Sequence, residues 1–307
     1  MRVGRASGLT DTGRRRLGNE DVFVCDPPVF AVADGMGGAP AGELASHLAA
    51  AALEERAAGL RGEATLEAVV REANDRVFKR AAADPAAAGM GTTVTVAVVD
   101  EAAGTLAIGH VGDSRAYRLR DGVLEQLTSD HSLVAELVRS GRLTQEEADK
   151  HPHKAVITRS VGTDQAVDVD TITLAMEEGD LYLLCSDGLT DMVSDDAIQA
   201  LGVAAGGDPD AFASTLVDAA NAGGGDDNIT VVAFEITGGE PVEPAEPTLD
   251  PNAEPESPRS GATADGGSTD TRVRRWGAGG GGRIPALLFL AGVAVISALA
   301  LYWGIAR

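Results

Sequence analysis

Cysteine, aromatic residues and positive charge are all scarce in this sequence. Two cysteines in 307 residues exclude a disulfide scaffold and fit a reducing compartment. Aromatic residues make up only 4%, so the core has to be built mainly from Ala, Val, Leu and Ile. Lys and Arg number 25 against 47 Asp and Glu, which gives a net charge of −22. Such a surface repels a phosphate backbone, which argues against a nucleic-acid binder.

Several catalytic signatures are also missing. The five histidines show no spacing typical of zinc ligands. A cysteine-dependent phosphatase needs an arginine six residues after its nucleophile, whereas Cys185 is followed there by Asp191 and Cys25 by Ala31. The chain contains no GxxxxGK[ST] loop, so it is not expected to be an ATPase or GTPase. No apolar run follows the N-terminus, and no cleaved secretory signal is expected.

Composition divides the chain into three parts and a short tail. Residues 1–236 alternate apolar strand-like runs with Ala-rich helical stretches and are predicted to form the catalytic domain. Residues 237–283 hold six of the 13 prolines, acidic residues and a glycine run, which predicts a disordered linker. Residues 284–303 carry no charge, and twenty helical residues span about 30 Å, the thickness of a bilayer core.

The charges around this apolar run predict its orientation in a membrane. Four arginines precede the run and one follows it: Arg272, Arg274, Arg275, Arg283 and, on the far side, Arg307. By the positive-inside rule, residues 1–236 are expected in the cytoplasm and residues 304–307 outside the cell. A buried core helix is the alternative, but a helix apolar on every face and next to a linker has no core to enter. We therefore predict a single-pass protein of the cell membrane.

The pattern within residues 1–236 predicts an α+β fold. Short β-branched runs bounded by turn formers predict five strands, at 29–35, 92–100, 105–113, 180–188 and 228–236. Helical periodicity covers 41–60, 64–83, 132–140, 195–205 and 210–220. Strands and helices do not alternate as they do in βαβ units. An antiparallel sheet system with helices packed outside is therefore expected.

Acidic residues stand at the margins of these strands. Asp34, Asp113 and Asp187 end strands, Asp227 precedes one, and Glu20 with Asp21 precedes the strand-like run VFVC. If the strand ends converge, the carboxylates cannot all stay ionised unless cations neutralise them. Mg²⁺ or Mn²⁺ would suit oxygen ligands. Taken singly, an Asp-Gly pair after a strand is more often an ordinary turn.

Six short segments resemble the metal-dependent serine/threonine protein phosphatases of the type 2C (PPM) family, most of all its bacterial branch. They are GRRRLGNED (13–21), ADGMGG (33–38), GMGTT (89–93), HVGDSRAY (110–117), SDGL (186–189) and GGDDNIT (224–230), in the family's order. The resemblance implies two stacked antiparallel sheets flanked by helix pairs, an α-β-β-α sandwich. It also implies hydrolysis of phosphoserine and phosphothreonine in proteins at a binuclear Mn²⁺ or Mg²⁺ centre, with a metal-bridging water as nucleophile.

The same resemblance assigns roles to residues of this chain. Asp34 would bridge both ions, with the Gly35 carbonyl and Glu20 at one and Asp187 and Asp227 at the other; Asp113 would join Asp187 at a possible third ion. Arg16 would receive the substrate phosphate, which makes Arg16, Asp34 and Asp187 the catalytic set. Asp21 and Asn228 would support these ligands from behind, whereas Arg14 and Arg15 are expected to be surface charges.

Two positions depart from the family pattern. Met36 stands where many eukaryotic relatives carry a histidine after Asp-Gly, so a different proton donor is needed. His151–Gly162 resembles the mobile flap of bacterial members, but Ala155 replaces an expected asparagine; we call these residues the flap segment.

The expected partners are phosphorylated proteins, chiefly membrane-bound serine/threonine kinases and their substrates. Two alternatives stay open at this stage. The chain could dephosphorylate a regulator of transcription, or it could be an inactive membrane-tethered module that only binds phosphoproteins.

Overall fold

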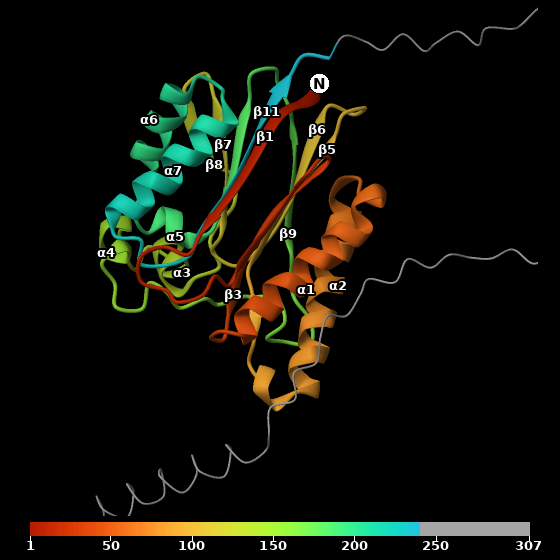
Figure 1. Cartoon of the computed structure of the whole chain (residues 1–307), viewed down its shortest axis with the longest axis vertical. Coiled ribbons are helices and arrows are strands. Elements are labelled where there is room, and N and C mark those ends of the chain that lie inside the picture. Colours follow the sequence, from red (N-terminus) through yellow and green to blue (C-terminus); the bar gives the residue numbers. More distant parts are fainter. Residues whose placement is uncertain (240–307) are drawn as a thin grey trace, which may run out of the picture. The chain divides into compact units, whose positions relative to one another are not determined.

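Two antiparallel sheets stack face to face in the computed structural model, which describes residues 1–239 (Figure 1). The strands are β1 (Arg2–Asp11), β2 (Asp21–Asp26), β3 (Val29–Met36), β4 (Gly91–Thr92), β5 (Val94–Asp100), β6 (Thr105–Val111), β7 (Arg115–Arg120), β8 (Val123–Gln126), β9 (Asp170–Ala175), β10 (Leu181–Cys185) and β11 (Ile229–Thr237). The α-helices are α1 (Ala41–Arg56), α2 (Gly62–Ala83), α3 (Leu133–Arg139), α4 (Gln145–Asp149), α5 (Asp187–Thr190), α6 (Asp195–Ala205) and α7 (Pro209–Gly223). Short 3₁₀ turns, Ala57–Gly59 and Pro85–Ala87, follow α1 and α2.

Each sheet has its own strand order. One sheet runs β1-β11-β10-β7-β8, and the other runs β2-β3-β5-β6-β9 with β4 beside β3. The first and last strands of the domain pair directly, because Arg2 lies opposite Thr237 and Asp11 opposite Ile229. The two chain ends of the domain are thereby fixed in the same sheet.

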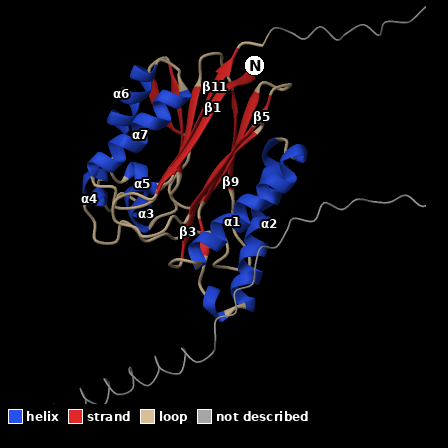
Figure 2. Ribbon diagram, viewed as in Figure 1, coloured by secondary structure: helices blue, strands red, loops and turns tan. Residues whose placement is uncertain are grey.

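Three apolar layers lie between the helices and the two sheets, whose stacking Figure 2 shows. Helices α1 and α2 cover the outer face of the β2–β9 sheet, and α6 and α7 cover the outer face of the other sheet. Between the sheets, the rings of Phe30 and Phe234 stack with centroids 3.9 Å apart. Along β11, Val231 and Ala233 pack toward the helices, while alternate residues face the opposite sheet, as the two-residue period of a strand requires. The predicted α+β fold with two antiparallel sheets is confirmed.

Local sequence explains where the outer helices begin and end. Helix α7 starts with Pro209 after Asp208, whose carboxylate accepts hydrogen bonds from the amides of Asp210 and Ala211. Helix α6 is capped by Ser194 and ends at Gly206, whose φ of 61° belongs to the left-handed region. These helices match the predicted ranges closely.

The predictions for the rest of the chain lie outside the described residues. They comprise the linker beyond residue 239, the membrane span at 284–303 and the tail at 304–307. Within residues 1–239, no helix has both the length and the apolar character of a membrane span.

Candidate metal centre

Five aspartates from both sheets lie close together. Asp21 on β2 lies directly opposite Asp34 on β3 in the strand ladder. Asp113 follows β6, Asp187 follows β10 and begins α5, and Asp227 precedes β11. The charges of the other four aspartates all act on Asp34, which therefore lies at the centre of the group. We call these five residues the carboxyl cluster.

Burial and mutual repulsion shift the protonation of this cluster. Burial is the main cause, and neighbouring carboxylates add to it, in raising the pKa of Asp34 well above its ordinary value. The same causes raise the pKa of Asp187 to about 6, of Asp21 to about 7 and of Asp113 to about 8. The cluster therefore holds protons near neutral pH unless a cation replaces them.

The donor atoms of the cluster fit a divalent cation. Among the described residues, Asp113 Oδ1 and Asp187 Oδ1 are buried without any hydrogen-bond partner, a state that ordinarily destabilises a protein. Oxygen donors of this kind suit Mg²⁺ or Mn²⁺. No three His, Cys, Asp or Glu side chains within residues 1–239 already form a complete ligand set. A divalent cation at the carboxyl cluster is therefore indicated by the burial of the cluster's oxygen atoms and by the two that lack a hydrogen-bond partner.

Two glycines let Glu20 approach the cluster. A Cβ atom on Gly35 would lie 2.2 Å from the carbonyl oxygen of Gly42, and one on Gly42 would lie 1.8 Å from Glu20 Oε2. The Glu20 carbonyl accepts hydrogen bonds from Gly35 N–H at 3.1 Å and from Ser46 Oγ at 2.6 Å. Burial raises the pKa of Glu20 as well. Gly42 and Ser46 on α1 were not predicted as part of the site.

Asp21 and Asn228 have the surroundings expected of supporting residues. Asp21 Oδ2 accepts a hydrogen bond from Ser186 Oγ at 2.8 Å. Asn228 Oδ1 accepts from the amide of Glu20 at 2.8 Å, and its Nδ2 donates to the carbonyls of Thr12 and Gly18. Asn228 thus fixes both ends of the loop that joins β1 to β2.

Arg16 lies in that loop and is directed at the cluster. Its Nη2 lies 2.6 Å from Asp227 Oδ2, and half of its side chain remains exposed. Burial opposes its charge, but Asp227, Glu20 and Asp34 together raise the pKa of Arg16. Arg15 instead pairs at 3.5 Å with the exposed Asp226. Of the two, Arg16 alone is paired with a cluster member, so it is placed to receive an anion there.

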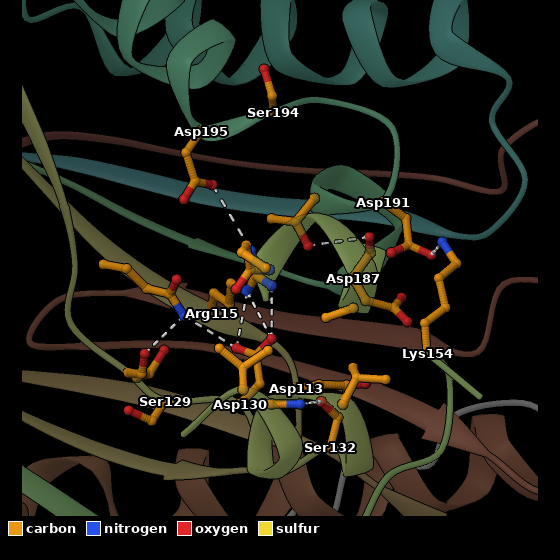
Figure 3. A pocket seen from close by; sticks show the side chains of 18 of the residues that line it. Asp113, Arg115, Ser129, Asp130, Ser132, Lys154, Asp187, Asp191, Ser194 and Asp195 are labelled. Atoms are coloured by element: carbon orange, nitrogen blue, oxygen red, sulfur yellow. Dashed lines mark hydrogen bonds and ion pairs between the residues drawn. The ribbon is translucent and has the colours of Figure 1, made fainter. Parts of the chain in front are cut away.

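A cavity of about 920 Å³ opens beside Asp113 and Asp187 (Figure 3). Arg115 forms a bidentate pair with Asp130, with distances of 2.9 Å from Nε to Oδ1 and 2.7 Å from Nη2 to Oδ2. Lys154 of the flap segment pairs with Asp191 at 2.8 Å. Ala155 also lines the cavity.

Sequence reasoning missed Arg115, Asp130 and Asp191 as site residues. Asp191 follows Asp187 by four positions, one helical turn, and its charge raises the pKa of Asp187. That spacing was a usable signal. Asp130 lies in a polar loop, and nothing in its local sequence points to Arg115.

Comparison with known proteins gives the family. A sequence model described as "Protein phosphatase 2C" matches residues 20–228. The serine/threonine protein phosphatase PstP of Mycobacterium tuberculosis is 42% identical over 241 residues, which cover 76% of this chain but only 45% of that protein. The serine/threonine phosphatase stp of Listeria monocytogenes is 40% identical over 238 residues, covering 74% of this chain and 93% of that protein. The chain belongs to the protein phosphatase 2C family.

Solved structures show the same fold. The crystal structure of PstP/Ppp from M. tuberculosis matches with a TM-score of 0.72 and 40% identity, covering 77% of this chain and all of that one. The PstP catalytic domain in complex with two manganese ions matches with a TM-score of 0.71 and 38% identity, covering 77% of this chain and 99% of that one.

Proposed function

We propose that residues 1–236 hydrolyse phosphoserine and phosphothreonine in proteins and depend on Mn²⁺ or Mg²⁺ for this activity. The observation that carries this proposal is the set of buried and half-buried carboxyl groups, two of them with buried unpaired oxygens, beside one arginine. Membership of the protein phosphatase 2C family and the two manganese ions bound by the PstP catalytic domain support it.

Each residue of the site has a part in this proposal. Glu20, Asp34, Gly35, Asp187 and Asp227 would hold two ions, and Asp113 with Asp187 would hold a third. When bound, such ions activate water and neutralise the oxygens of a phosphoryl group. Arg16 would bind the phosphate through two parallel charge-assisted hydrogen bonds, an arrangement for which its planar guanidinium is suited. Before phosphate binds, the hydrogen bond to Asp227 keeps that guanidinium directed at the cluster.

The direct test uses the full chain after metal has been removed with a chelator. Phosphate release from a phosphothreonine peptide is measured before and after Mn²⁺ or Mg²⁺ is added. We expect release only after addition. Activity that persists in excess chelator, or that requires a reduced thiol, would refute the proposed chemistry.

We also propose that residues 284–303 anchor the protein in the cell membrane, with residues 1–236 in the cytoplasm. The support comes from the sequence: an uncharged stretch of bilayer length with four arginines before it and one after it. An enzyme held there meets membrane-bound kinases and their substrates at raised effective concentration. Counteracting such kinases is the cellular role that this location favours.

A further inference from the structure

His131 connects three segments around the carboxyl cluster. It precedes α3, and only 3% of its surface is exposed. Its Nδ1 accepts a hydrogen bond from the amide of Gly112 at 3.0 Å, and its own amide donates to the Gly112 carbonyl at 2.7 Å. Gly112 is the residue before Asp113. The ring and backbone of His131 therefore bind both backbone polar groups of the residue that precedes this aspartate in the chain.

The other ring nitrogen binds a different element. Because Nδ1 accepts, the proton of the neutral ring is on Nε2, which lies 3.1 Å from Asp170 Oδ2 on β9 and 2.9 Å from Nη1 of Arg159. Of these two neighbours only the carboxylate oxygen can accept that proton, because a guanidinium is a donor alone. Arg159 of the flap segment donates to the second oxygen of that carboxylate, Asp170 Oδ1, at 2.5 Å. Burial first, and the charge of Arg159 as well, keep the pKa of His131 below its ordinary value, so the ring stays neutral.

The backbone of His131 also holds the flap segment. Its carbonyl accepts a hydrogen bond from the amide of Thr158 at 2.8 Å. Two residues further on, the amide of Leu133 donates to the carbonyl of Val156 at 2.9 Å. The end of the flap segment is thus bound to the residue that binds the Gly112 peptide.

The position of Asp113 depends on the backbone of Gly112, the residue before it. Its Oδ1 has no hydrogen-bond partner among the described residues, so that oxygen has no bond of its own to orient it. Gly112 has a φ of 116°, and a Cβ there would lie 2.5 Å from Thr93 Cβ, so the loop has little freedom on its other side. The hydrogen bonds from the ring and the backbone of His131 constrain the loop further.

We propose that His131 is a positioning residue that fixes the loop carrying Asp113 through Gly112 and joins this loop to β9 and the flap segment. The consequence for activity rests on the function proposed above, because it requires Asp113 to act in the metal centre. The consequence for the loop does not depend on that function.

A pair of substitutions separates the two ring nitrogens. In His131→Asn, the amide oxygen takes the place of Nδ1 and still accepts from Gly112 N–H, while the link to Asp170 is lost. In His131→Gln, the amide nitrogen takes the place of Nε2 and still reaches Asp170, while the Gly112 link is lost. The same pair at His47, which is exposed on α1, serves as the control.

Three readouts are taken on the full chain: hydrogen exchange at the Gly112 amide without metal, Mn²⁺ affinity, and kcat and KM for a phosphothreonine peptide. We expect His131→Gln to speed Gly112 exchange and to lower kcat or Mn²⁺ affinity roughly ten- to a hundredfold, with KM little changed. His131→Asn should stay much closer to the wild type in all three. Melting temperatures should fall in both variants.

The proposal that His131 fixes the loop fails if the Gly112 amide exchanges at the same rate in His131→Asn and His131→Gln. Its consequence for activity fails if exchange differs between the two variants while Mn²⁺ affinity and kcat do not. A wild-type protein without metal-dependent activity would refute the proposed function instead, and the exchange experiment would still decide whether His131 fixes the loop.

Discussion

At the scale of single residues, Asp34 is the most connected member of the carboxyl cluster. Its amide donates to Thr93 Oγ1 at 3.1 Å, and its carbonyl accepts from Thr92 Oγ1 at 2.8 Å and from the Thr93 amide at 2.8 Å. Four other aspartates act on its carboxyl group. Hydrogen bonds therefore fix the backbone of Asp34, while its carboxyl group remains available to bind a cation.

Asp34→Asn should consequently be the most damaging single change at the site. It removes the ligand expected to bridge two ions, so both bind more weakly. The loss of kcat should exceed the roughly ten- to hundredfold typical of a supporting residue. Asp113→Asn should leave two ions bound and slow turnover. Rates and Mn²⁺ titrations of the two variants check this, and near-native rates for Asp34→Asn would show that the bridging role is wrong.

Arg16→Ala should separate phosphate binding from metal binding. A lost hydrogen bond to a charged group costs about 1.5–3 kcal/mol, which corresponds to a roughly ten- to hundredfold rise in KM for phosphopeptides. Mn²⁺ affinity should change much less than KM, because Arg16 is not itself a ligand and only pairs with one, Asp227. Arg15→Ala is the matched control, since within residues 1–239 Arg15 forms an ion pair only with the exposed Asp226. Equal KM values for the two variants would show that Arg16, like Arg15, is a surface charge without a part in phosphate binding.

At the scale of elements, the first turn of α1 is shaped by Glu20. Alanine is a better helix former than glycine by about 1 kcal/mol, so Gly42→Ala would stabilise an isolated helix. Here its Cβ would lie 1.8 Å from Glu20 Oε2. We expect a net loss of about 1–3 kcal/mol of unfolding free energy and weaker Mn²⁺ binding.

Gly59→Ala is the control for this substitution, because nothing lies within 4 Å of the Cβ it would add. Chemical denaturation and Mn²⁺ titration of both variants give the comparison. A Gly42→Ala protein as stable as the wild type, with unchanged Mn²⁺ affinity, would mean that Glu20 has room to move away at no cost.

The sequence predicted some elements well and missed others, for physical reasons. Strands β5, β6, β10 and β11 are buried on both faces and read as continuous apolar runs. Strand β1 carries two glycines and has no fully buried residue, and β9 alternates threonine with apolar residues at a sheet edge. Their strand character comes from pairing with β11 and β6, which local sequence does not contain.

In the candidate metal centre, too, the local sequence predicted some features and not those that depend on the tertiary fold. Carboxylates at strand ends could be found from the sequence, because each follows or precedes an apolar run. The contacts of Gly42 with Glu20 and of His131 with Gly112 could not, because they join residues 22 and 19 positions apart through the tertiary fold.

At the scale of the whole molecule, we expect residues 1–236 to carry the catalytic activity and the apolar run at 284–303 to determine where the protein is located. A chain that stops after residue 240 should be released from membranes and keep its turnover on small substrates. The full chain should resist extraction by carbonate or high salt and yield only to detergent, because about twenty apolar residues are involved. Release by salt alone would mean that residues 284–303 are not a span.

The carboxyl cluster also makes cation binding and proton release one process. Its raised pKa values, about 6 for Asp187, 7 for Asp21 and 8 for Asp113, mean that the metal-free protein binds protons that a cation must displace. Cation affinity should therefore fall as the pH falls through this range.

Calorimetric titration of the metal-stripped full chain with Mn²⁺ is the most direct measurement, made at about pH 6 in two buffers of different ionisation enthalpy. We predict saturable binding of at least two ions, with an observed enthalpy that depends on the buffer because protons leave the cluster. At about pH 9 that dependence should shrink. Absence of saturable binding, or equal enthalpies in both buffers at the lower pH, would contradict a cluster built to exchange protons for cations.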